Sequence, residues 1–519
     1  FVEEAWRTGV DVFRIFDSLN WMESIAPCIE HVRKKTGGLA EGSICYTGDI
    51  LDPSRKKYDL RYYIRLAKDI ENAGAHILGV KDMAGLLKPD AAFMLIQALK
   101  SEIDIPVHLH THDTSSIQTA TYLKAIEAGV DVVDVALGGL SGLTSQPNFN
   151  SVLEMLRFHE RENPMDTEKL AAYSNYWEAI RNYYYPFESG LRSGTGEVYG
   201  HEIPGGQYSN LKGQAIALGL EDRFTDITKM YGQVNHMFGD IVKVTPSSKV
   251  VGDMAQFMVG NDLTVDDIMT KGETISFPES VKSFFRGDLG QPYGGFPAKL
   301  QSIVLKDEKP YTGRPNAHLE PIDFERDFKE FKRMFKNGMG RELEITDFLS
   351  YRLYPKVFME AYNNHVKNGN VINVPTKNFL YGMQVGEEIM VELDKGKKVL
   401  ISLMLKGEPD EAGQVNLFFK INGQLRNVLI KDSAVNVTKK ENKKADASNA
   451  KHIGSPLQGS LSDVLVKEGQ EIKKNQPLFI IEAMKMESTV VATSDGTVDQ
   501  ILIEAGALVG SDDLIITLK

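Results

Sequence analysis

The sequence is poor in cysteine, with only Cys28 and Cys45 among its 519 residues. Two cysteines cannot build a disulfide scaffold, and such low usage suits a reducing compartment. No apolar run approaches the roughly 18 residues that cross a bilayer, and no signal peptide is visible. The formal net charge of −12 argues against general binding to nucleic acids or anionic membranes.

Two widespread catalytic signatures are also missing. The chain has no Gly-x-x-x-x-Gly-Lys-Ser/Thr loop, and hence no candidate ATP site, and it has no Gly-x-Ser-x-Gly nucleophile elbow. The pairs Gly205-Gly206 and Gly294-Gly295 are predicted to be turns rather than phosphate cradles. These absences argue against ATP chemistry and serine-hydrolase chemistry within these residues.

The overall composition is that of a soluble globular protein, with 42% hydrophobic and 25% charged residues. A chain of this length is too long for one ordinary core, so about three domains are expected. Phe1 is not an initiator methionine, so we expect that the chain has been cut or processed. Targeting information upstream of Phe1 would then be out of sight.

Residues 1–150 alternate apolar, β-branched runs with amphipathic helical patterns. Their spacing is close to one βα unit of an eight-fold barrel. Five units are visible where a closed barrel needs eight, so we expect three units upstream. A five-stranded open α/β sheet is the alternative. The predicted strands are Val10–Phe16, Ser43–Tyr46, His76–Val80, Ile105–His110 and Val130–Val135.

The rest of the chain changes character three times. Residues 151–365 are predicted to be mainly helical, and residues 366–438 carry short alternating strands that predict a small β module. Residues 439–451, rich in Lys, Asn, Ala and Asp, predict a flexible linker. Residues 452–519 form a duplicated unit, in which Gly459, Gly469, Leu465 and Leu478 recur as Gly496, Gly506, Leu502 and Ile515 at one constant offset.

Three histidines alternate along one predicted strand. His108, His110 and His112 therefore point to one side of it. His110 and His112 lie at its C-terminal end, where barrel active sites are found. Two such histidines can ligate a metal, and a hydrogen-bonded loop pair is the alternative. For His108, a place in the core is the simpler prediction.

Lys81 ends the preceding predicted strand and therefore lies on the same rim. Such a lysine can form a Schiff base, bind an anion or pair with an acidic side chain. An ammonium group cannot ligate a metal, whereas a lysine that has reacted with carbon dioxide is a carbamate, which can. The spacing alone does not choose among these roles.

Thr245 opens the segment Thr-Pro-Ser-Ser-Lys. The pattern is typical of a helix start, with threonine as the N-cap and Pro246 at the first helical position. A threonine hydroxyl at the rim of a site can also give and take a proton. The two roles are compatible, because a capping side chain is rigidly placed.

Lys485 lies in Glu-Ala-Met-Lys-Met-Glu, where the halves of the duplicated unit join and a hairpin tip is expected. A bare lysine at a turn is usually a solvated cation. Flanked by methionines in a symmetric all-β module, it resembles the biotinylation site of a biotin carboxyl carrier domain. A lipoyl domain has a similar symmetry, but its lysine typically lacks the paired methionines.

An ordered set of motifs extends this resemblance along the chain. The motifs are Phe-Arg-Ile-Phe-Asp-Ser-Leu-Asn at 13–20, Lys-Asp-Met-Ala-Gly-Leu-Leu-Lys-Pro at 81–89, His-Leu-His-Thr-His-Asp-Thr at 108–114, Ile-Pro-Gly-Gly-Gln-Tyr at 203–208 and Lys-Val-Thr-Pro-Ser-Ser-Lys at 243–249. Together with the Lys485 motif, they make the chain similar to the C-terminal part of the pyruvate carboxylases.

The resemblance implies a multidomain α/β plus β protein. Its parts would be five units of a carboxyltransferase TIM (β/α)8 barrel in 1–150, a helical funnel in 151–365, a small β-rich tetramerisation or allosteric domain in 366–438, the linker 439–451 and an all-β biotin carrier domain in 452–519. The family's biotin carboxylase domain and first three barrel strands, which carry the fourth metal ligand and a pyruvate-binding arginine, are missing. An isolated five-unit barrel should therefore be poorly stable.

The resemblance also implies roles for individual residues. Lys81, as a carbamate, would bind Mn²⁺ or Zn²⁺ together with His110 and His112. Thr245 would move the proton between the methyl group of pyruvate and biotin. Lys249 and Gln207 would line the substrate site, and Lys485 would carry biotin covalently.

The implied activity is transfer of a carboxyl group from carboxybiotin to pyruvate, giving oxaloacetate, within an enzyme that consumes ATP and bicarbonate. The implied partners are biotin protein ligase, a biotin carboxylase domain, further copies in a homotetramer and the activator acetyl-CoA, but no nucleic acid and no membrane. The expected compartment is the cytoplasm, or the mitochondrial matrix in a eukaryote. The alternatives are an oxaloacetate decarboxylase α subunit, a transcarboxylase subunit, and a non-enzymatic biotin carrier and oligomerisation scaffold.

Overall fold

The computed structural model describes residues 1–188, 190–336, 339–410, 413–432, 442–446, 449, 451–483 and 486–519. Contacts divide the chain into two compact units, Val2–Leu319 with Asn442–Lys519, and Glu320–Glu441 with Phe1. No helix in the described ranges is long and apolar enough to span a bilayer. The domain boundaries after residues 150, 365, 438 and 451 stay predictions.

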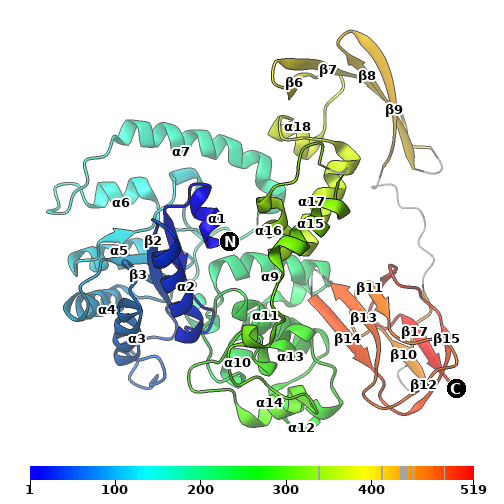
Figure 1. Cartoon of the computed structure of the whole chain (residues 1–519), viewed down its shortest axis with the longest axis horizontal. Helices are drawn as coiled ribbons and strands as arrows, with labels where there is room; N and C mark the ends of the chain where they lie inside the picture. Colours follow the sequence, from blue (N-terminus) through cyan, green and yellow to red (C-terminus); the bar gives the residue numbers. More distant parts are fainter. Residues whose placement is uncertain are drawn as a thin grey trace. The chain divides into compact units, whose positions relative to one another are not determined.

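The first unit begins with a parallel five-stranded sheet in the order β1-β2-β3-β4-β5, with a helix before each strand (Figure 1). This is the predicted succession of βα units, and the fold class of a partial barrel is confirmed. β1 and β5 each have one strand neighbour among the described strands. The elements are α1 (Val2–Arg7), β1 (Val12–Ile15), α2 (Met22–Lys35), β2 (Leu39–Cys45), α3 (Leu60–Asn72), β3 (Ile77–Asp82), α4 (Pro89–Glu102), β4 (Val107–Thr111), α5 (Gln118–Glu127) and β5 (Val132–Val133).

The two faces of this sheet differ because successive strand residues point to opposite sides. Ile44, Val80 and Leu109 stand side by side on β2, β3 and β4 and are buried in a core shared with helices α2–α5. The next residues along each strand, Cys45, Lys81 and His110, form the neighbouring row. The apolar row packs against the helices, and the neighbouring row contains the polar side chains of Lys81 and His110.

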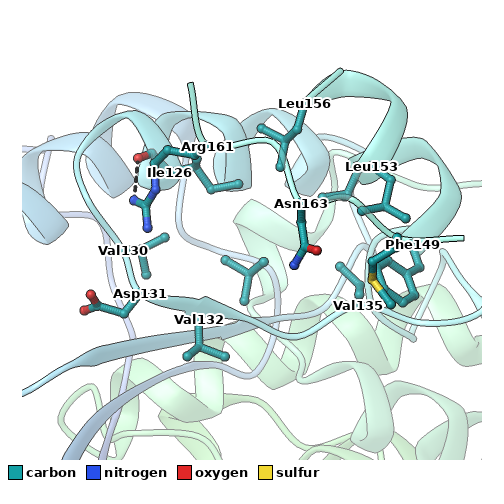
Figure 2. Close-up of a pocket in the computed structure, with 13 residues that line it drawn as sticks. Ile126, Val130, Asp131, Val132, Val135, Phe149, Leu153, Leu156, Arg161 and Asn163 are labelled. Atoms are coloured by element: carbon teal, nitrogen blue, oxygen red, sulfur yellow. Dashed lines mark hydrogen bonds between the residues drawn. The ribbon is translucent and has the colours of Figure 1, made fainter. Parts of the chain in front are cut away.

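A pocket of about 300 Å³ lies between β5 and helix α6 (Phe149–Met155) (Figure 2). Its lining is mainly apolar and includes Val132 and Leu153. Arg161 also lines it, and its Nη1 donates to the carbonyl of Ile126 at 3.1 Å. The pocket thus lies beside the last strand of the sheet.

Residues 138–318 are mainly helical, as predicted, and build a second core around Tyr231, Phe238, Met254 and Phe284, all fully buried. This core holds helices α9–α11, which carry the segments around Gln207 and Thr245. The elements are η1 (Gly138–Leu140), α6, α7 (Thr167–Arg181), η2 (Asn182–Phe187), α8 (Val198–His201), α9 (Gly205–Ala217), η3 (Glu221–Arg223), α10 (Phe224–Met237), α11 (Ser247–Gly260), α12 (Val265–Lys271), η4 (Gly272–Thr274), α13 (Glu279–Arg286), α14 (Ala298–Leu305) and η5 (Pro315–His318).

The second unit joins four helices to an antiparallel four-stranded sheet in the order β6-β7-β8-β9. Its helical core is aromatic, with Phe331, Phe335, Phe348 and Phe358 buried. The sheet is the β module predicted from the alternating strands. The elements are α15 (Phe324–Met334), α16 (Ile345–Leu353), α17 (Pro355–Asn368), α18 (Thr376–Tyr381), β6 (Glu388–Asp394), β7 (Lys397–Lys406), β8 (Gln414–Ile421) and β9 (Gln424–Lys431).

The C-terminal residues form two antiparallel four-stranded sheets, in the orders β10-β17-β15-β12 and β14-β13-β11-β16. The predicted duplication is visible in the strands, since β10–β13 recur as β14–β17. Each sheet takes two strands from each half. The strands are β10 (His452–Gly454), β11 (Gly459–Val464), β12 (Glu471–Ile472), β13 (Pro477–Ala483), β14 (Met486–Val491), β15 (Gly496–Ile501), β16 (Leu508–Val509) and β17 (Leu514–Leu518).

Candidate active site

Lys81 and His110 stand opposite each other in the register of β3 and β4, near the C-terminal ends of both strands. Lys81 is 8% exposed, and its Nζ lies 4.6 Å from the centroid of the Phe16 ring. Burial lowers the pKa of Lys81 below its ordinary value, an effect only partly opposed by nearby acidic groups. A lysine in this place has an increased fraction of neutral, nucleophilic amine.

His110 and His112 face each other, with their Nε2 atoms 3.3 Å apart. His110 Nδ1 lies 2.8 Å from Asp134 Oδ2, and His112 Nδ1 lies 2.6 Å from the carbonyl of Thr144. A carbonyl or carboxylate oxygen can only accept, so both Nδ1 atoms donate. Burial lowers the pKa of His112 to about 4, which keeps its ring neutral. A neutral imidazole that donates from Nδ1 carries its lone pair on Nε2, so in the neutral form both rings present a lone pair at this contact.

This pair fits a metal ion. A tetrahedral metal at about 2.0–2.1 Å from each nitrogen requires two nitrogens about 3.3 Å apart, which is the distance between these Nε2 atoms. Within the described residues, no group of three or more His, Cys, Asp or Glu side chains could hold a metal. The pair therefore needs another ligand, and Lys81 could supply one only as a carbamate.

Two glycines allow the chain to pack against His112. A Cβ on Gly205 would lie 2.8 Å from His112 Nδ1 and 2.9 Å from the carbonyl oxygen of Thr144. A Cβ on Gly85, whose φ is +72°, would lie 2.2 Å from the carbonyl oxygen of His112. The predicted turn at Gly205-Gly206 is wrong, because Gly205 begins α9. The glycine is needed for close approach to His112, not for a turn.

Gln207 lies in the first turn of α9 and is 6% exposed. Its Nε2 has no hydrogen-bond partner among the described residues. A Cβ on Gly252 of α11 would lie 2.8 Å from this nitrogen, so the amide is held between α9 and α11. A buried donor without a partner is costly, and a bound polar molecule would satisfy it.

Thr245 is exposed and lies two residues before the start of α11. The predicted N-cap role is wrong. Pro246 is the N-cap residue of α11 and not, as predicted, its first helical residue. No side chain caps this helix. Ser247 fixes the turn instead, since its Oγ accepts from the amide of Val244 at 3.2 Å and lies 2.7 Å from the carbonyl of Val244. Among the described residues, no hydrogen bond joins Thr245 to Lys81, His110 or His112.

Lys249 lies in the first turn of α11 and binds a buried carboxylate. Its Nζ is 2.6 Å from Asp253 Oδ2, which also accepts from Ser280 Oγ at 2.6 Å. Asp253 is fully buried, and burial raises its pKa above the ordinary value despite the charge of Lys249. Lys249 and Thr245 are four residues apart in the sequence. The ion pair with Asp253 therefore holds the Lys249 ammonium group near the N-terminal end of α11, which Thr245 precedes.

A buried ion cluster that the sequence did not reveal fixes the segment before Thr245. Lys243 Nζ lies 2.8 Å from Glu202 Oε2 and 3.1 Å from Thr47 Oγ1. Arg55 Nη1 lies 2.5 Å from Glu202 Oε1. Burial alone would raise the pKa of Glu202, but Lys243 and Arg55 bring it below its ordinary value. The cluster joins the segment leading to Thr245 to the loop after β2.

His108 is 9% exposed, as predicted for a core residue, and contacts two carboxylates. Its ring nitrogens lie 2.9 Å from Asp134 Oδ1 and 3.2 Å from Glu41 Oε2. Burial opposes protonation of this ring, but the two carboxylates raise its pKa to about 9. Asp134 and Glu41 were not predicted as site residues, although both are charged residues inside apolar strand patterns.

Lys485 lies outside the described residues. β13 and β14 pair up to Ala483 and Met486, the residues on either side of the Met484-Lys485 segment. The prediction that Lys485 carries biotin stays a prediction.

Three family models match successive parts of the chain. An HMGL-like model matches residues 18–176, the conserved carboxylase domain matches residues 198–402, and the biotin-requiring enzyme model matches residues 451–518. Pyruvate carboxylase from Bacillus subtilis is 48% identical over 519 residues, and human mitochondrial pyruvate carboxylase is 41% identical over 522. These alignments cover 100% of this chain and 45% and 44% of those proteins.

Solved structures agree. The carboxyl transferase domain of Rhizobium etli pyruvate carboxylase with pyruvate is 48% identical, with a TM-score of 0.79, and the match covers 83% of this chain and 72% of that one. This chain belongs to the pyruvate carboxylase family. The complete multifunctional pyruvate carboxylase from Rhizobium etli matches 100% of this chain, with 47% of its own length covered and a TM-score of 0.78.

The chain spans less than half the length of the curated pyruvate carboxylases it matches, 45% for the Bacillus subtilis protein. Its sheet and helical region correspond to the carboxyltransferase part of the family, and its C-terminal domain is a biotinyl domain. The cofactors are covalently bound biotin and a divalent metal.

Proposed function

We propose that this chain is the carboxyl-transfer part of a pyruvate carboxylase, which moves a carboxyl group from carboxybiotin to pyruvate and gives oxaloacetate. A biotin carboxylase domain, upstream or on another subunit, would use ATP and bicarbonate. The observation that carries the proposal is the facing Nε2 pair of His110 and His112 beside buried Lys81. It lies in a chain that matches a carboxyl transferase domain along 83% of its length.

Lys81 would become a ligand by reacting with carbon dioxide. The neutral amine attacks the carbon, an N–C bond forms, one proton leaves to solvent, and the product is an anionic carbamate. The buried place of Lys81 and its register with His110 support this role. The carbamate, His110 and His112 would together hold Mn²⁺ or Zn²⁺. The bound metal would supply positive charge that orients pyruvate and stabilises its enolate.

Thr245 would carry the proton. Its exposed hydroxyl would take a proton from the methyl group of pyruvate and pass its own to the biotin nitrogen from which carbon dioxide has left. The enolate formed in this way would attack that carbon dioxide and give oxaloacetate. A threonine hydroxyl is too weak a base to act as a free alkoxide, so the two transfers are concerted. The fixed turn at Ser247 and the Lys243–Glu202 pair support this role because they hold the segment around Thr245 in one place.

Gln207 and Lys249 would line the substrate site. The unsatisfied Nε2 of Gln207 can donate to a carboxylate or carbonyl oxygen. Lys249 keeps a side-chain exposure of 32% while bound to Asp253, so it can present positive charge to an anionic substrate. These features support binding of a small α-keto acid.

Lys485 would carry biotin after the action of biotin protein ligase, and the segment 439–451 would let the biotinyl domain move between sites. A tethered carrier keeps its cargo at high effective concentration near the acceptor. We further propose a homotetramer, activation by acetyl-CoA, and a place in the cytoplasm, or in the mitochondrial matrix of a eukaryote. A structure of Rhizobium etli pyruvate carboxylase with the allosteric activator acetyl coenzyme-A supports the effector.

Oxaloacetate formation in the full-length protein tests the proposal. The expected result is oxaloacetate from pyruvate only when ATP and bicarbonate are both present, with avidin abolishing the activity. Decarboxylation of oxaloacetate without any need for ATP would instead identify a decarboxylase subunit. Stoichiometric biotin without stoichiometric metal would indicate a carrier scaffold.

Substitution of Thr245 tests the proton-transfer step. Thr245→Ala should lower carboxyl transfer by at least about 100-fold, the usual contribution of a positioned proton carrier. Biotinylation of Lys485, measured by streptavidin blotting, should be unchanged. Transfer at the wild-type rate in Thr245→Ala would exclude this role.

A further inference from the structure

Four charged or ionisable side chains form a layer next to the Lys81–His110 row. They are Arg14 of β1, Glu41 of β2, His108 of β4 and Asp134, which follows β5. We call them the inner charged layer. These residues have no part in the proposed transfer of the carboxyl group, although Asp134 contacts His110.

Arg14 joins the two carboxylates of this layer. Its Nε lies 2.7 Å from Glu41 Oε1, and its Nη1 lies 3.0 Å from Asp134 Oδ2. β1 and β5 are the first and last strands of the sheet. One arginine therefore spans from one edge of the sheet to the other, which requires a sheet strongly curved around the layer.

Asp134 is held from three directions. Its Oδ2 lies 2.8 Å from His110 Nδ1 and 3.0 Å from Arg14 Nη1, and its Oδ1 lies 2.9 Å from His108 Nε2. Both carboxylate oxygens are thus occupied, and Arg14 itself is held by Glu41. The orientation of the Asp134 carboxylate is fixed by the other members of the layer.

A neutral imidazole carries its proton on one nitrogen and a lone pair on the other. Because the Asp134 carboxylate accepts from His110 Nδ1, the lone pair of His110 is on Nε2, the atom that faces His112. Without this acceptor, the proton could move to Nε2 and block ligation. A carboxylate acceptor also makes the ligating nitrogen more basic.

We propose that Asp134 is a positioning residue for the metal, which fixes the tautomer and ring orientation of His110, and that the rest of the inner charged layer fixes Asp134. This inference rests on the proposed function, because it takes His110 as a metal ligand. His112 is different, since its Nδ1 donates to the backbone carbonyl of Thr144. Only the His110 half of the pair depends on a side chain.

Asp131 offers a matched control. It is a second carboxylate beside β5, and it lines the pocket shown in Figure 2. Its Oδ2 lies 2.8 Å from Lys100 Nζ and 2.7 Å from the amide nitrogen of Val107, and no ligand histidine is among these partners. Asp131→Asn removes the same charge from the same part of the sheet without touching His110.

The experiment measures binding of Mn²⁺ alone to the metal-free full-length protein, by equilibrium dialysis, for wild type, Asp134→Asn and Asp131→Asn. Loss of such a supporting carboxylate typically weakens metal binding about 10- to 100-fold, so Asp134→Asn should lose this much and Asp131→Asn should match wild type. The visible spectrum of the Co²⁺-loaded protein should change only in Asp134→Asn. The unfolding temperature of each metal-free protein is recorded to separate ligand geometry from general stability.

Wild-type Mn²⁺ affinity and an unchanged Co²⁺ spectrum in Asp134→Asn would overturn the inference while leaving the metal site intact, and so would an equal loss in Asp131→Asn. A wild-type protein that binds no Mn²⁺ would overturn the metal site and the inference together. If Asp134→Asn does not fold, Asp134→Glu keeps the charge beside Arg14 but moves the carboxylate by one methylene. Weaker Mn²⁺ binding by folded Asp134→Glu supports the inference, and wild-type affinity overturns it.

Discussion

Gly205→Ala should separate the geometry of His112 from the stability of α9. The added methyl group would lie 2.8 Å from His112 Nδ1 and 2.9 Å from the carbonyl oxygen of Thr144, in contact with both atoms of an existing 2.6 Å hydrogen bond. Either the bond breaks and the ring of His112 turns, or the start of α9 moves away. When the ring turns, the Nε2 atoms of the histidine pair lose their spacing.

The size of the effect follows from two opposed contributions. Overpacking of a filled site costs about 1–3 kcal/mol, which is roughly a 5- to 150-fold change in an equilibrium constant. Alanine is the better helix former by up to about 1 kcal/mol. Gly206 provides the control, because a Cβ there meets no atom within 4 Å. Gly206→Ala should therefore gain the higher helix propensity of alanine without a clash between the added methyl group and a neighbouring atom.

The assay is Mn²⁺ affinity by equilibrium dialysis, together with urea unfolding of the metal-free protein. Gly205→Ala should bind Mn²⁺ about 5- to 150-fold more weakly, with the loss of affinity larger than any loss of stability. Gly206→Ala should bind Mn²⁺ normally and unfold at equal or higher urea concentration. The reasoning is refuted if Gly205→Ala keeps the affinity and stability of wild type, because His112 would then not depend on the missing methyl.

Two further changes test the packing away from the metal. Glu202→Gln should lower the free energy of unfolding by about 3–5 kcal/mol, because the buried Lys243 ammonium loses its counter-charge and the more exposed Arg55 loses a weaker one. The pKa of Glu202 is lower in the folded protein than in the unfolded chain. Its contribution to the free energy of unfolding is therefore fully present above the unfolded pKa of about 4.3 and is lost as the pH falls through the lower folded pKa. Urea titrations across this range should show that loss in wild type and not in Glu202→Gln. Leu478→Ala, at a fully buried position, should destabilise the biotinyl domain by about 2–5 kcal/mol. Leu465→Ala, at a position that is 43% exposed, should change the free energy of unfolding of this domain by no more than about 0.5 kcal/mol. Thermal unfolding of both variants measures the difference.

The parts of the fold that follow from local pattern were predictable. Apolar runs separated by helical periodicity located all five strands of the parallel sheet, because β2, β3 and β4 are buried against helices on one face and β1 and β5 are partly buried. The constant offset of the repeats predicted a duplication in the biotinyl domain, and its strands β10–β13 recur as β14–β17. Lys81 and His110 were placed on one rim because parallel strands end at the same edge of a sheet.

The parts that depend on contacts between distant segments were not predictable. Thr-Pro is typical of a helix start, but here the hydroxyl of Ser247 fixes the turn before α11. Thr245 therefore does not cap the helix and remains exposed. Glu202 meets Arg55 across 147 residues of sequence, and no local signal marks either one. Gly205 looked like a turn residue, whereas its real constraint is the ring of His112.

The interleaved sheets of the biotinyl domain bear on its ancestry. Each sheet contains two strands from each half of the repeat, so neither half alone can hydrogen-bond a complete sheet. An ancestral peptide of half this length could have reached the same arrangement only as a pair of identical chains. Fusion of two gene copies would make that association intramolecular and independent of concentration. It would also leave a connection between β13 and β14 at the point where the two chains were joined.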